Sequence, residues 1–238
     1  MSVKYKRVLL KVSGEALEDK ADGQVFSEQM LKGLADQIGG LVKLGVQVIV
    51  VVGAGNIMRG GQGAHLGMPQ AEADDIGMLG TVINSLAIKG TLEKEGIKAK
   101  AFSSFEALKP IAYYTRREAL EALGEGEVVI VGGGTGNPFF TTDSAAALRA
   151  LELDAQAILM AKNGVDGVYT ADPNKDRDAK LIKKTTYREI LTLGLKVMDA
   201  TAAGLLLNSK VVTRVFSMKP ENFAKVIGGE DLGTVITA

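Results

Sequence analysis

Short runs of apolar, β-branched residues alternate along the chain with segments whose apolar residues recur every three or four positions. Residues 7–12 predict a strand, and residues 46–52 predict a second strand that is buried on both faces, because it hardly alternates between apolar and polar positions. Between them, apolar residues from Met30 to Val42 recur at helical spacing, which indicates a helix that faces a core. Together these segments form a βαβ unit.

The same alternation continues along the rest of the chain. It predicts helices over residues 75–95, 116–123, 144–153, 187–193 and 200–207, with a further short helix before the last strand, and strands over 99–102, 128–131, 157–160, 211–216 and 234–236. This order favours an α/β fold in which helices cover both faces of a mostly parallel sheet, a three-layer α/β/α sandwich. Ligands of such sheets bind beyond the carboxyl ends of the strands.

Composition narrows the classes of function. The 238 residues carry 28 Lys and Arg against 28 Asp and Glu, and this zero net charge speaks against a nucleic-acid-binding protein. Cysteine is absent, which excludes disulfides, thiolate nucleophiles and the usual zinc sites, and the single histidine is His65. No apolar run approaches the roughly 18 residues of a membrane span. We expect a cytoplasmic protein without a membrane partner.

Three of the predicted strands run into turns rich in glycine, over residues 11–15, 53–61 and 132–143. Glycine lets the backbone approach an anion closely, and the free N–H groups of such turns form anion-binding concavities. One such turn is equally well explained by strand-to-helix geometry alone. Three in one sheet, two of them flanked by a lysine or an arginine, indicate a phosphate site.

The familiar nucleotide-binding signatures do not fit. No Walker A sequence occurs, and in the Rossmann pattern Gly53 and Gly55 match but the third glycine falls on Met58. Residues 60–69 are expected to form a loop. Lys162 ends a buried strand, and Asp143 is expected to be the N-cap of the helix that follows it, from where its carboxylate can still orient a lysine.

Four motifs together resemble the bacterial UMP kinases of the amino acid kinase superfamily, and the resemblance extends over essentially the whole chain. They are Lys11-x-Ser13-Gly14-Glu15, Gly53-x-Gly55-Asn56-x-x-Arg59-Gly60, the run Thr-Gly-Asn-Pro-Phe-Phe-Thr-Thr-Asp over 135–143, and Asp166-Gly167-Val168-Tyr169-x-x-Asp172-Pro173. The resemblance implies the amino acid kinase fold in one domain, with an acceptor lobe over about 1–153 and an ATP lobe over about 154–238. It also implies transfer of the γ-phosphoryl group of ATP to UMP, Mg²⁺ carried with ATP, a homohexamer, activation by GTP and inhibition by UTP.

The same resemblance assigns residues to roles. The catalytic residues it implies are Lys11, Lys162 and Asp143. Those implied to hold ATP are Lys11, Ser13, Gly14, Gly55, Arg59, Asn163, Tyr169 and Asp172. Those implied to hold UMP are Ala54, Asp74, Thr135, Gly136, Asn137, Pro138, Phe139, Phe140, Thr141 and Thr142. Ala54 departs from the glycine usual in the family, and its Cβ would add strain if the backbone there required a positive φ.

The chemistry leaves alternatives open at this point. A phosphate monoester has a second pKa near 6 and is mostly ionised at pH 7, so a phosphate acceptor needs no catalytic histidine. A carboxylate acceptor needs none either, so a carbamate or amino acid kinase of the same superfamily fits equally well. A non-catalytic UMP or UTP sensor on this fold is a third possibility.

Overall fold

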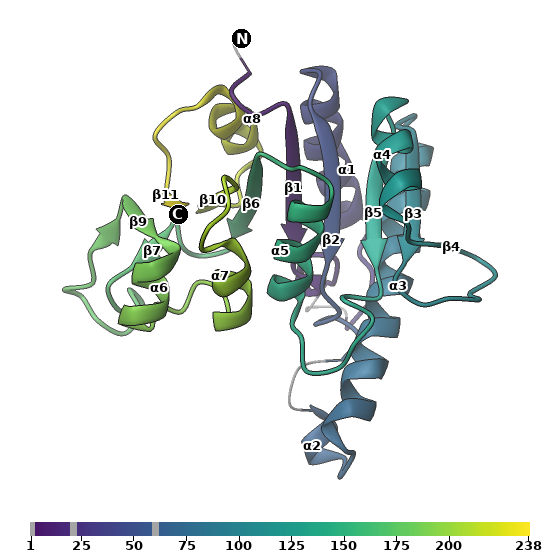
Figure 1. Ribbon diagram of the computed structural model, residues 1–238, viewed down its shortest axis with the longest axis horizontal. Coiled ribbons are helices and arrows are strands. Elements are labelled where there is room, and N and C mark those ends of the chain that lie inside the picture. Colours follow the sequence, from purple (N-terminus) through teal and green to yellow (C-terminus); the bar gives the residue numbers. More distant parts are fainter. Residues whose placement is uncertain (1–2, 20–22, 59–61) are drawn as a thin grey trace.

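A mostly parallel sheet forms the centre of the molecule (Figure 1). The structure is a computed structural model that describes residues 3–19, 23–58 and 62–238. Within this part of the chain, nine strands follow one another in space as β4 (Ala112–Tyr113), β3 (Ala99–Ser103), β5 (Val128–Gly132), β2 (Gln47–Val52), β1 (Arg7–Val12), β6 (Ala157–Lys162), β10 (Val212–Ser217), β11 (Thr234–Thr237) and β9 (Lys184–Thr186). Neighbouring strands are parallel, except that β10 and β11 are antiparallel.

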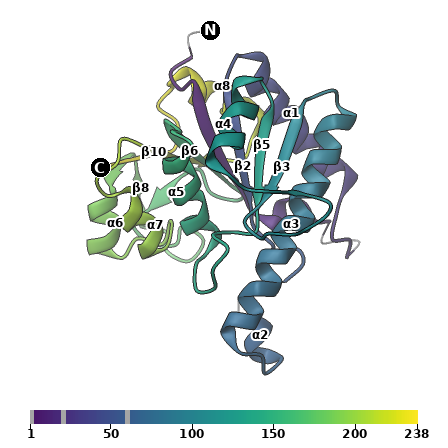
Figure 2. The ribbon, with the colours of Figure 1, turned by 45° about the vertical axis from the view of Figure 1, so that its right-hand side comes forward.

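Helices cover both faces of this sheet, so the predicted three-layer sandwich is confirmed (Figures 1 and 2). One face packs against α1 (Glu28–Lys43), α3 (Gln70–Lys94) and α8 (Pro220–Gly228). The other packs against α4 (Arg116–Gly124), α5 (Thr142–Glu152), α6 (Tyr187–Leu193) and α7 (Ala200–Leu206). The short α2 (Gln62–His65) and the beginning of α3 project beyond the sheet in both views.

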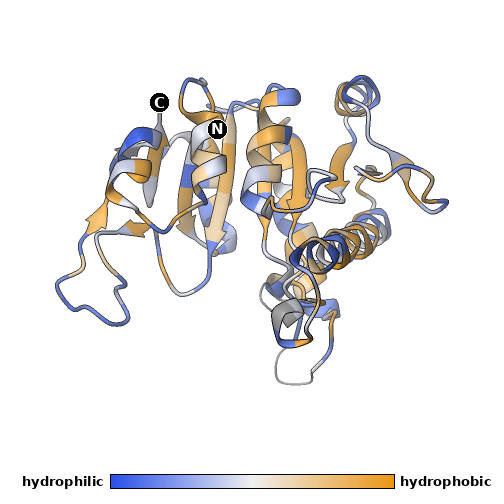
Figure 3. Cartoon of the chain, turned by 60° about the horizontal axis from the view of Figure 1, so that its bottom comes forward, coloured by the Kyte–Doolittle hydropathy of each residue, from blue (hydrophilic) through white to orange (hydrophobic). Residues whose placement is uncertain are grey.

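The strands are buried on both faces, as continuous apolar runs in a parallel sheet require. All five residues of β5 are buried, and so are five of the six in β2. In Figure 3 the strands of the sheet are coloured predominantly hydrophobic, whereas the loops and outer helix turns are mostly hydrophilic. None of the helices that the structure describes has both the length and the apolar character needed to cross a bilayer.

Two local predictions about the site segments were wrong. The helix expected from residue 75 begins at Gln70, and α2 lies within the segment expected to be a loop, so Asp74 is part of a helix. Asp143 is not the N-cap of α5, because Thr141 is: its hydroxyl accepts hydrogen bonds from the N–H groups of Asp143 and Ser144. Asp143 therefore sits in the first turn of α5, with its carboxylate available to a partner outside the helix.

The polar segment over 162–178 contains a strand that is too short to be seen in the sequence pattern. β7 (Val168–Tyr169) pairs antiparallel with β8 (Leu181–Ile182), and the two form a separate small sheet. The hydroxyl of Thr234 in β11 fastens this hairpin to the main sheet: it accepts from Val168 N–H at 2.8 Å and donates to the Ile182 carbonyl at 2.6 Å.

The alternation of side chains along β1 decides where its lysine points. Val8, Leu10 and Val12 pack on the side of α1 and α8, whereas Leu9 packs on the side of α5. Because successive side chains of a strand point to opposite faces, Lys11 shares the face of Leu9. Strand β1 pairs directly with β6, so one sheet runs through both lobes implied by the resemblance, and the division at residue 153 stays a prediction.

Candidate active site

Two lysines and one carboxylate converge where β1, β6 and α5 meet. Lys11 Nζ lies 2.9 Å from Asp143 Oδ1, and both side chains are about four-fifths buried. Lys162 ends β6. Burial lowers the pKa of Lys162, the positive charge of Lys11 lowers it further, and Asp143 opposes both effects. The cluster holds two ammonium groups against one carboxylate, so a bound anion would restore its charge balance.

The first and second glycine turns touch each other beside this cluster. A Cβ added to Gly14 would lie 2.5 Å from Asn56 Oδ1, 2.6 Å from Gly55 N and 2.7 Å from Gly53 O. No side chain fits in that space, so glycine at position 14 is what allows the two turns to approach. The turns of β1 and β2 thus form one continuous surface.

A buried amide holds the second turn in place. Asn84, on α3 and fully buried, donates to the Gly53 carbonyl at 2.7 Å and exchanges two hydrogen bonds with Asn56, at 2.8 and 3.0 Å. Ala54 is buried and is not among the described residues with a positive φ, so the strain foreseen for its Cβ does not arise. A Cβ on Gly80 would come within 2.9 Å of that of Ala54, so a glycine on α3 makes room for the alanine.

The third turn is built on left-handed backbone. Gly133, Gly134 and Gly136 have φ values of 77°, 56° and 80°. Phe139 also lies in the left-handed region, with a φ of 69°, and its N–H donates to Asp74 Oδ2 at 2.8 Å. Because a non-glycine residue adopts this conformation only at a cost, the bond to Asp74 helps to hold the loop over α3.

Asp199 joins the end of this loop to the other half of the chain. Its carboxylate accepts hydrogen bonds from the hydroxyls of Thr141 and Ser144 and from the N–H of Ala202, where it caps α7. Burial by itself would raise the pKa of Asp199, but the hydrogen bonds from Thr141, Ala202 and Ser144 outweigh it and the pKa is lowered. The carboxylate is therefore charged in the folded protein at neutral pH.

The three turns enclose a cavity of about 340 Å³. The predicted site residues that line it are Lys11, Ser13, Gly14, Ala54, Gly55, Asp74, Phe140, Thr141 and Thr142. Five predicted UMP residues belong to the same loop but do not line this cavity: Thr135, Gly136, Asn137, Pro138 and Phe139. Arg59, expected to hold the ATP phosphates, lies outside the described residues.

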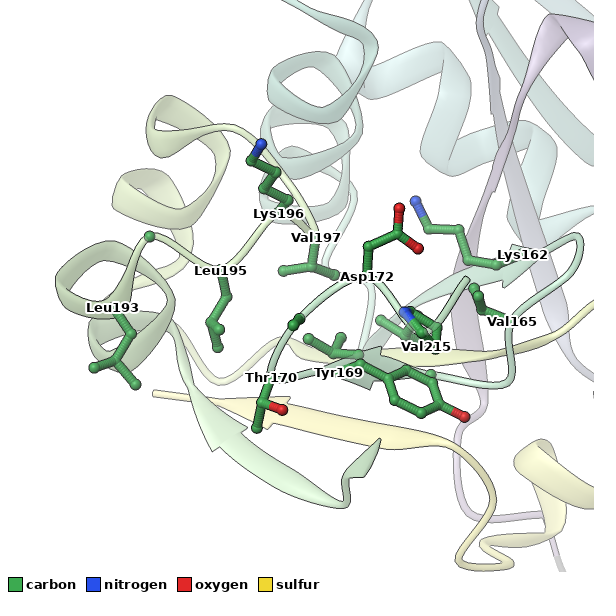
Figure 4. Close-up of a pocket in the computed structure, with 15 residues that line it drawn as sticks. Lys162, Val165, Tyr169, Thr170, Asp172, Leu193, Leu195, Lys196, Val197 and Val215 are labelled. Carbon is green, nitrogen blue, oxygen red and sulfur yellow. The ribbon is translucent and has the colours of Figure 1, made fainter. Parts of the chain in front are cut away.

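A second cavity, of about 490 Å³, opens on the other side of the cluster, and Lys162, Tyr169 and Asp172 line it. Figure 4 shows the side chains of Lys162 and Asp172 directed to the same side of this cavity, above the Tyr169 ring. The Tyr169 hydroxyl donates to Asp166 Oδ1 at 2.5 Å, and this bond raises the pKa of the phenol. Asn163, predicted with these residues, instead lines a third cavity between α1 and α8, which Lys11 also lines.

Two residues that position the site were missed in the sequence. Asn84 is a polar residue among the regularly spaced apolar residues of a long helix, and this exception to the pattern could have indicated its role. Asp199 was visible as a helix cap ahead of Ala200, but its bond to Thr141 joins residues 58 positions apart and only the fold reveals it. His65 lies exposed in α2 and lines none of the three cavities described above.

Glycine turns and paired lysines at the carboxyl ends of a parallel sheet define a class of α/β proteins that bind phosphates. The chain belongs to the amino acid kinase family, which it matches over residues 6–217. It is 45% identical to the uridylate kinase of Pediococcus pentosaceus over 236 residues, which cover 98% of this chain and 97% of that protein.

Two solved structures agree with this assignment. The structure is similar to that of UMP kinase from Bacillus anthracis, with a TM-score of 0.94, 39% identity, and coverage of 98% of this chain and 96% of that one. It is also similar to UMP kinase from Ureaplasma parvum, with a TM-score of 0.92, 34% identity, and coverage of 99% and 100%. The predicted amino acid kinase fold is confirmed.

Proposed function

We propose that the chain is a UMP kinase, which transfers the γ-phosphoryl group of ATP to UMP and forms ADP and UDP for pyrimidine nucleotide biosynthesis. Relatives named uridylate kinase or UMP kinase match nearly the whole chain, and this coverage favours UMP over carbamate or an amino acid as acceptor.

The two lysines of the cluster line different cavities, and this placement supports the proposed function most directly. Lys11 lines the cavity formed by the three glycine turns, and Lys162 lines the cavity of Tyr169 and Asp172. The two lysines are close enough for the charge of one to lower the pKa of the other. Two phosphorylated ligands, one in each cavity, would therefore bring their phosphates together at this cluster.

The residues of the lysine cluster would promote the reaction by neutralising negative charge on the transferred phosphoryl group. In phosphoryl transfer the protein mainly positions the two reactants and neutralises charge on the group in transit. Lys11 and Lys162 supply that neutralisation, and Asp143 holds Lys11 at the transfer point through the 2.9 Å ion pair. The acceptor phosphate is already ionised at neutral pH, so no general base is required.

We propose that Mg²⁺ arrives bound to the phosphates of ATP. In the ranges that the structure covers, no group of three or more His, Cys, Asp and Glu side chains could enclose a metal ion. Mg²⁺ is commonly held by one or two carboxylates together with substrate phosphates. Asp143, through the oxygen that does not face Lys11, would supply such a carboxylate, and Mg²⁺ would neutralise part of the charge on the phosphates.

The decisive experiment measures ADP release by the purified protein with ATP, Mg²⁺ and each of UMP, CMP, AMP and GMP, and separately with carbamate, glutamate and aspartate. Turnover with UMP well above that with every other acceptor is expected. Preferred turnover with a carboxylate acceptor would replace the proposal with another activity of the family, and tight UMP or UTP binding without ADP release would indicate a sensor.

We also propose that the chain assembles as a homohexamer in the cytoplasm, and that GTP activates it and UTP inhibits it. An apolar stripe on α3 supports self-assembly: Ile76, Leu79 and Ile83 are 38%, 45% and 49% exposed, and their spacing places them on one face. Light scattering after size-exclusion chromatography should give a mass near six times 25.0 kDa. A monomer would contradict the assembly.

A further inference from the structure

Arg149, on α5, is a buried cation for which the proposed reaction has no use. Its side chain is 6% exposed, although an arginine is rarely buried unless it is paired. Asp143, which holds Lys11, lies on the same helix, so α5 connects Arg149 to the lysine cluster. The contacts of the guanidinium indicate what the burial achieves.

The guanidinium is held from three directions. Arg149 Nη1 lies 2.5 Å from Glu152 Oε2, and Nη2 donates to Ser104 Oγ at 2.8 Å. Its Cζ stacks 4.2 Å from the centroid of the Tyr114 ring. The Tyr114 hydroxyl donates to the same Glu152 oxygen at 2.9 Å, and burial, followed by this bond, raises the pKa of the phenol, which keeps it a donor. The side chain therefore has one well-defined position.

The fourth partner of Arg149 is the backbone of the third glycine turn, over residues 132–143, which we call the acceptor turn. Nη2 lies 3.4 Å from the Gly134 carbonyl, to which Ser104 Oγ donates at 2.9 Å. The turn also rests on Ser104: a Cβ added to Gly133 would lie 2.9 Å from Ser104 N, and one added to Gly136 would lie 3.3 Å from Ser104 O. Arg149 and Ser104 together form the floor beneath this turn.

The direction of that carbonyl determines the direction of the next N–H. A trans peptide is planar, with its C=O and N–H pointing to opposite sides. Because the Gly134 carbonyl points down to Ser104 and Arg149, the N–H of Thr135 points away from them, on the outer side of the turn. Gly134 itself lines the cavity of the three turns.

We propose that Arg149 is a positioning residue for the acceptor nucleotide: by holding the Gly134 carbonyl it fixes the orientation of the Gly134–Thr135 peptide, and with it the part of the turn that lines the cavity for UMP. This inference rests on the proposed UMP kinase activity and adds a residue that does not touch substrate. Arginine is required because its planar guanidinium donates to Glu152 and Ser104 at the same time and stacks its face on the Tyr114 ring. The single ammonium group of a lysine cannot make these contacts together.

The test compares Arg149→Lys with wild type. The lysine keeps the positive charge beside Glu152 but loses the second N–H donor of the guanidinium. Losing an intramolecular hydrogen bond from a charged donor shifts a conformational equilibrium about tenfold or more, here the equilibrium between the held and the released turn, and the affinity for UMP falls by the same factor if only the held turn binds it. The KM for UMP, and the Kd for UMP measured by calorimetry without ATP, should both rise about tenfold. The KM for ATP should stay within about twofold of wild type, a split that a general loss of structure would not produce.

Arg116→Lys is the matched control. Arg116, on α4, also contacts Glu152, through its Nε and the Glu152 carbonyl, but its side chain is 56% exposed and it does not contact the acceptor turn. This variant should keep both KM values. If Arg149→Lys fails to fold, Ser104→Ala decides the question, because it removes the hydroxyl that lies between Arg149 and the Gly134 carbonyl and should raise the KM for UMP selectively.

Each outcome is informative. An unchanged KM for UMP in an active Arg149→Lys protein, or equal increases for UMP and ATP, would overturn the positioning role and leave the proposed function intact. A wild-type protein that neither binds nor phosphorylates UMP would refute the proposed function, and this inference with it.

Discussion

Replacement of Gly14 by alanine should separate the two turns that shape the phosphate site. The added Cβ would lie 2.6 Å from Gly55 N and 2.7 Å from Gly53 O, both backbone atoms that cannot rotate away. Non-bonded heavy atoms settle at about 3.5 Å or more, so the turns must move apart by roughly 1 Å. A misplacement of about 1 Å costs on the order of a hundredfold in rate when geometry drives the reaction, and we expect that loss in kcat/KM.

The assay is steady-state ADP release with UMP, together with thermal unfolding of the same samples. Gly40→Ala is the control: this residue lies in α1, and an added Cβ would meet nothing within 4 Å. Alanine there should leave turnover unchanged and stabilise the helix by up to about 1 kcal/mol. If Gly14→Ala retained kcat/KM within about threefold of wild type, the close approach of the two turns would not matter for the chemistry.

Three further variants test separate parts of the site. Lys162→Met should lower kcat by about a hundredfold or more with little change in either KM, because it removes a charge that acts on the group in transit; near-normal turnover would exclude that role. Thr234→Val should raise the KM for ATP but not for UMP, because it deprives Val168 N–H of its acceptor and loosens the hairpin that carries Tyr169; equal changes in both KM values would contradict this. Because the pKa of Asp199 is lowered by folding, its carboxylate stabilises the protein above the ordinary value of 3.8, and this contribution disappears as the pH falls through the folded value. The difference in unfolding free energy between wild type and Asp199→Asn, measured by urea titration, should therefore shrink towards acid pH, and a constant difference would refute the assignment.

Helices and long strands were predictable because their apolar periodicity is local. The strand over residues 7–12 and the helix over 187–193 have the predicted limits, and β5 extends its predicted range by a single residue. The two- and three-residue strands β4, β7, β8 and β9 were not predicted, because so few residues carry no recognisable period. They exist because neighbouring backbone pairs with them, which a local pattern does not record.

The candidate site shows the same division between local and distant information. The motif that carries Lys11, the motif that ends in Asp143 and the lysine at position 162 could be singled out because each follows an apolar strand or precedes a helix. The ion pair between Lys11 and Asp143 could not be derived from spacing, since 132 positions separate them and only the alternation along β1 turns the lysine towards α5. The cap at Thr141 was misplaced by two residues because Asp143 is an equally good capping residue by type.

The layered α/β architecture, the glycine turns at the strand ends and the resemblance to one family can all be read from contiguous residues of the sequence. Which polar groups face one another depends on the folded structure. Asn84, Asp199 and Arg149 stabilise loops that are distant in the chain, and their partners are chosen by how the helices pack on the sheet. Hydrogen bonds and ion pairs act over a few ångströms of space, so their partners are fixed only when the chain has folded.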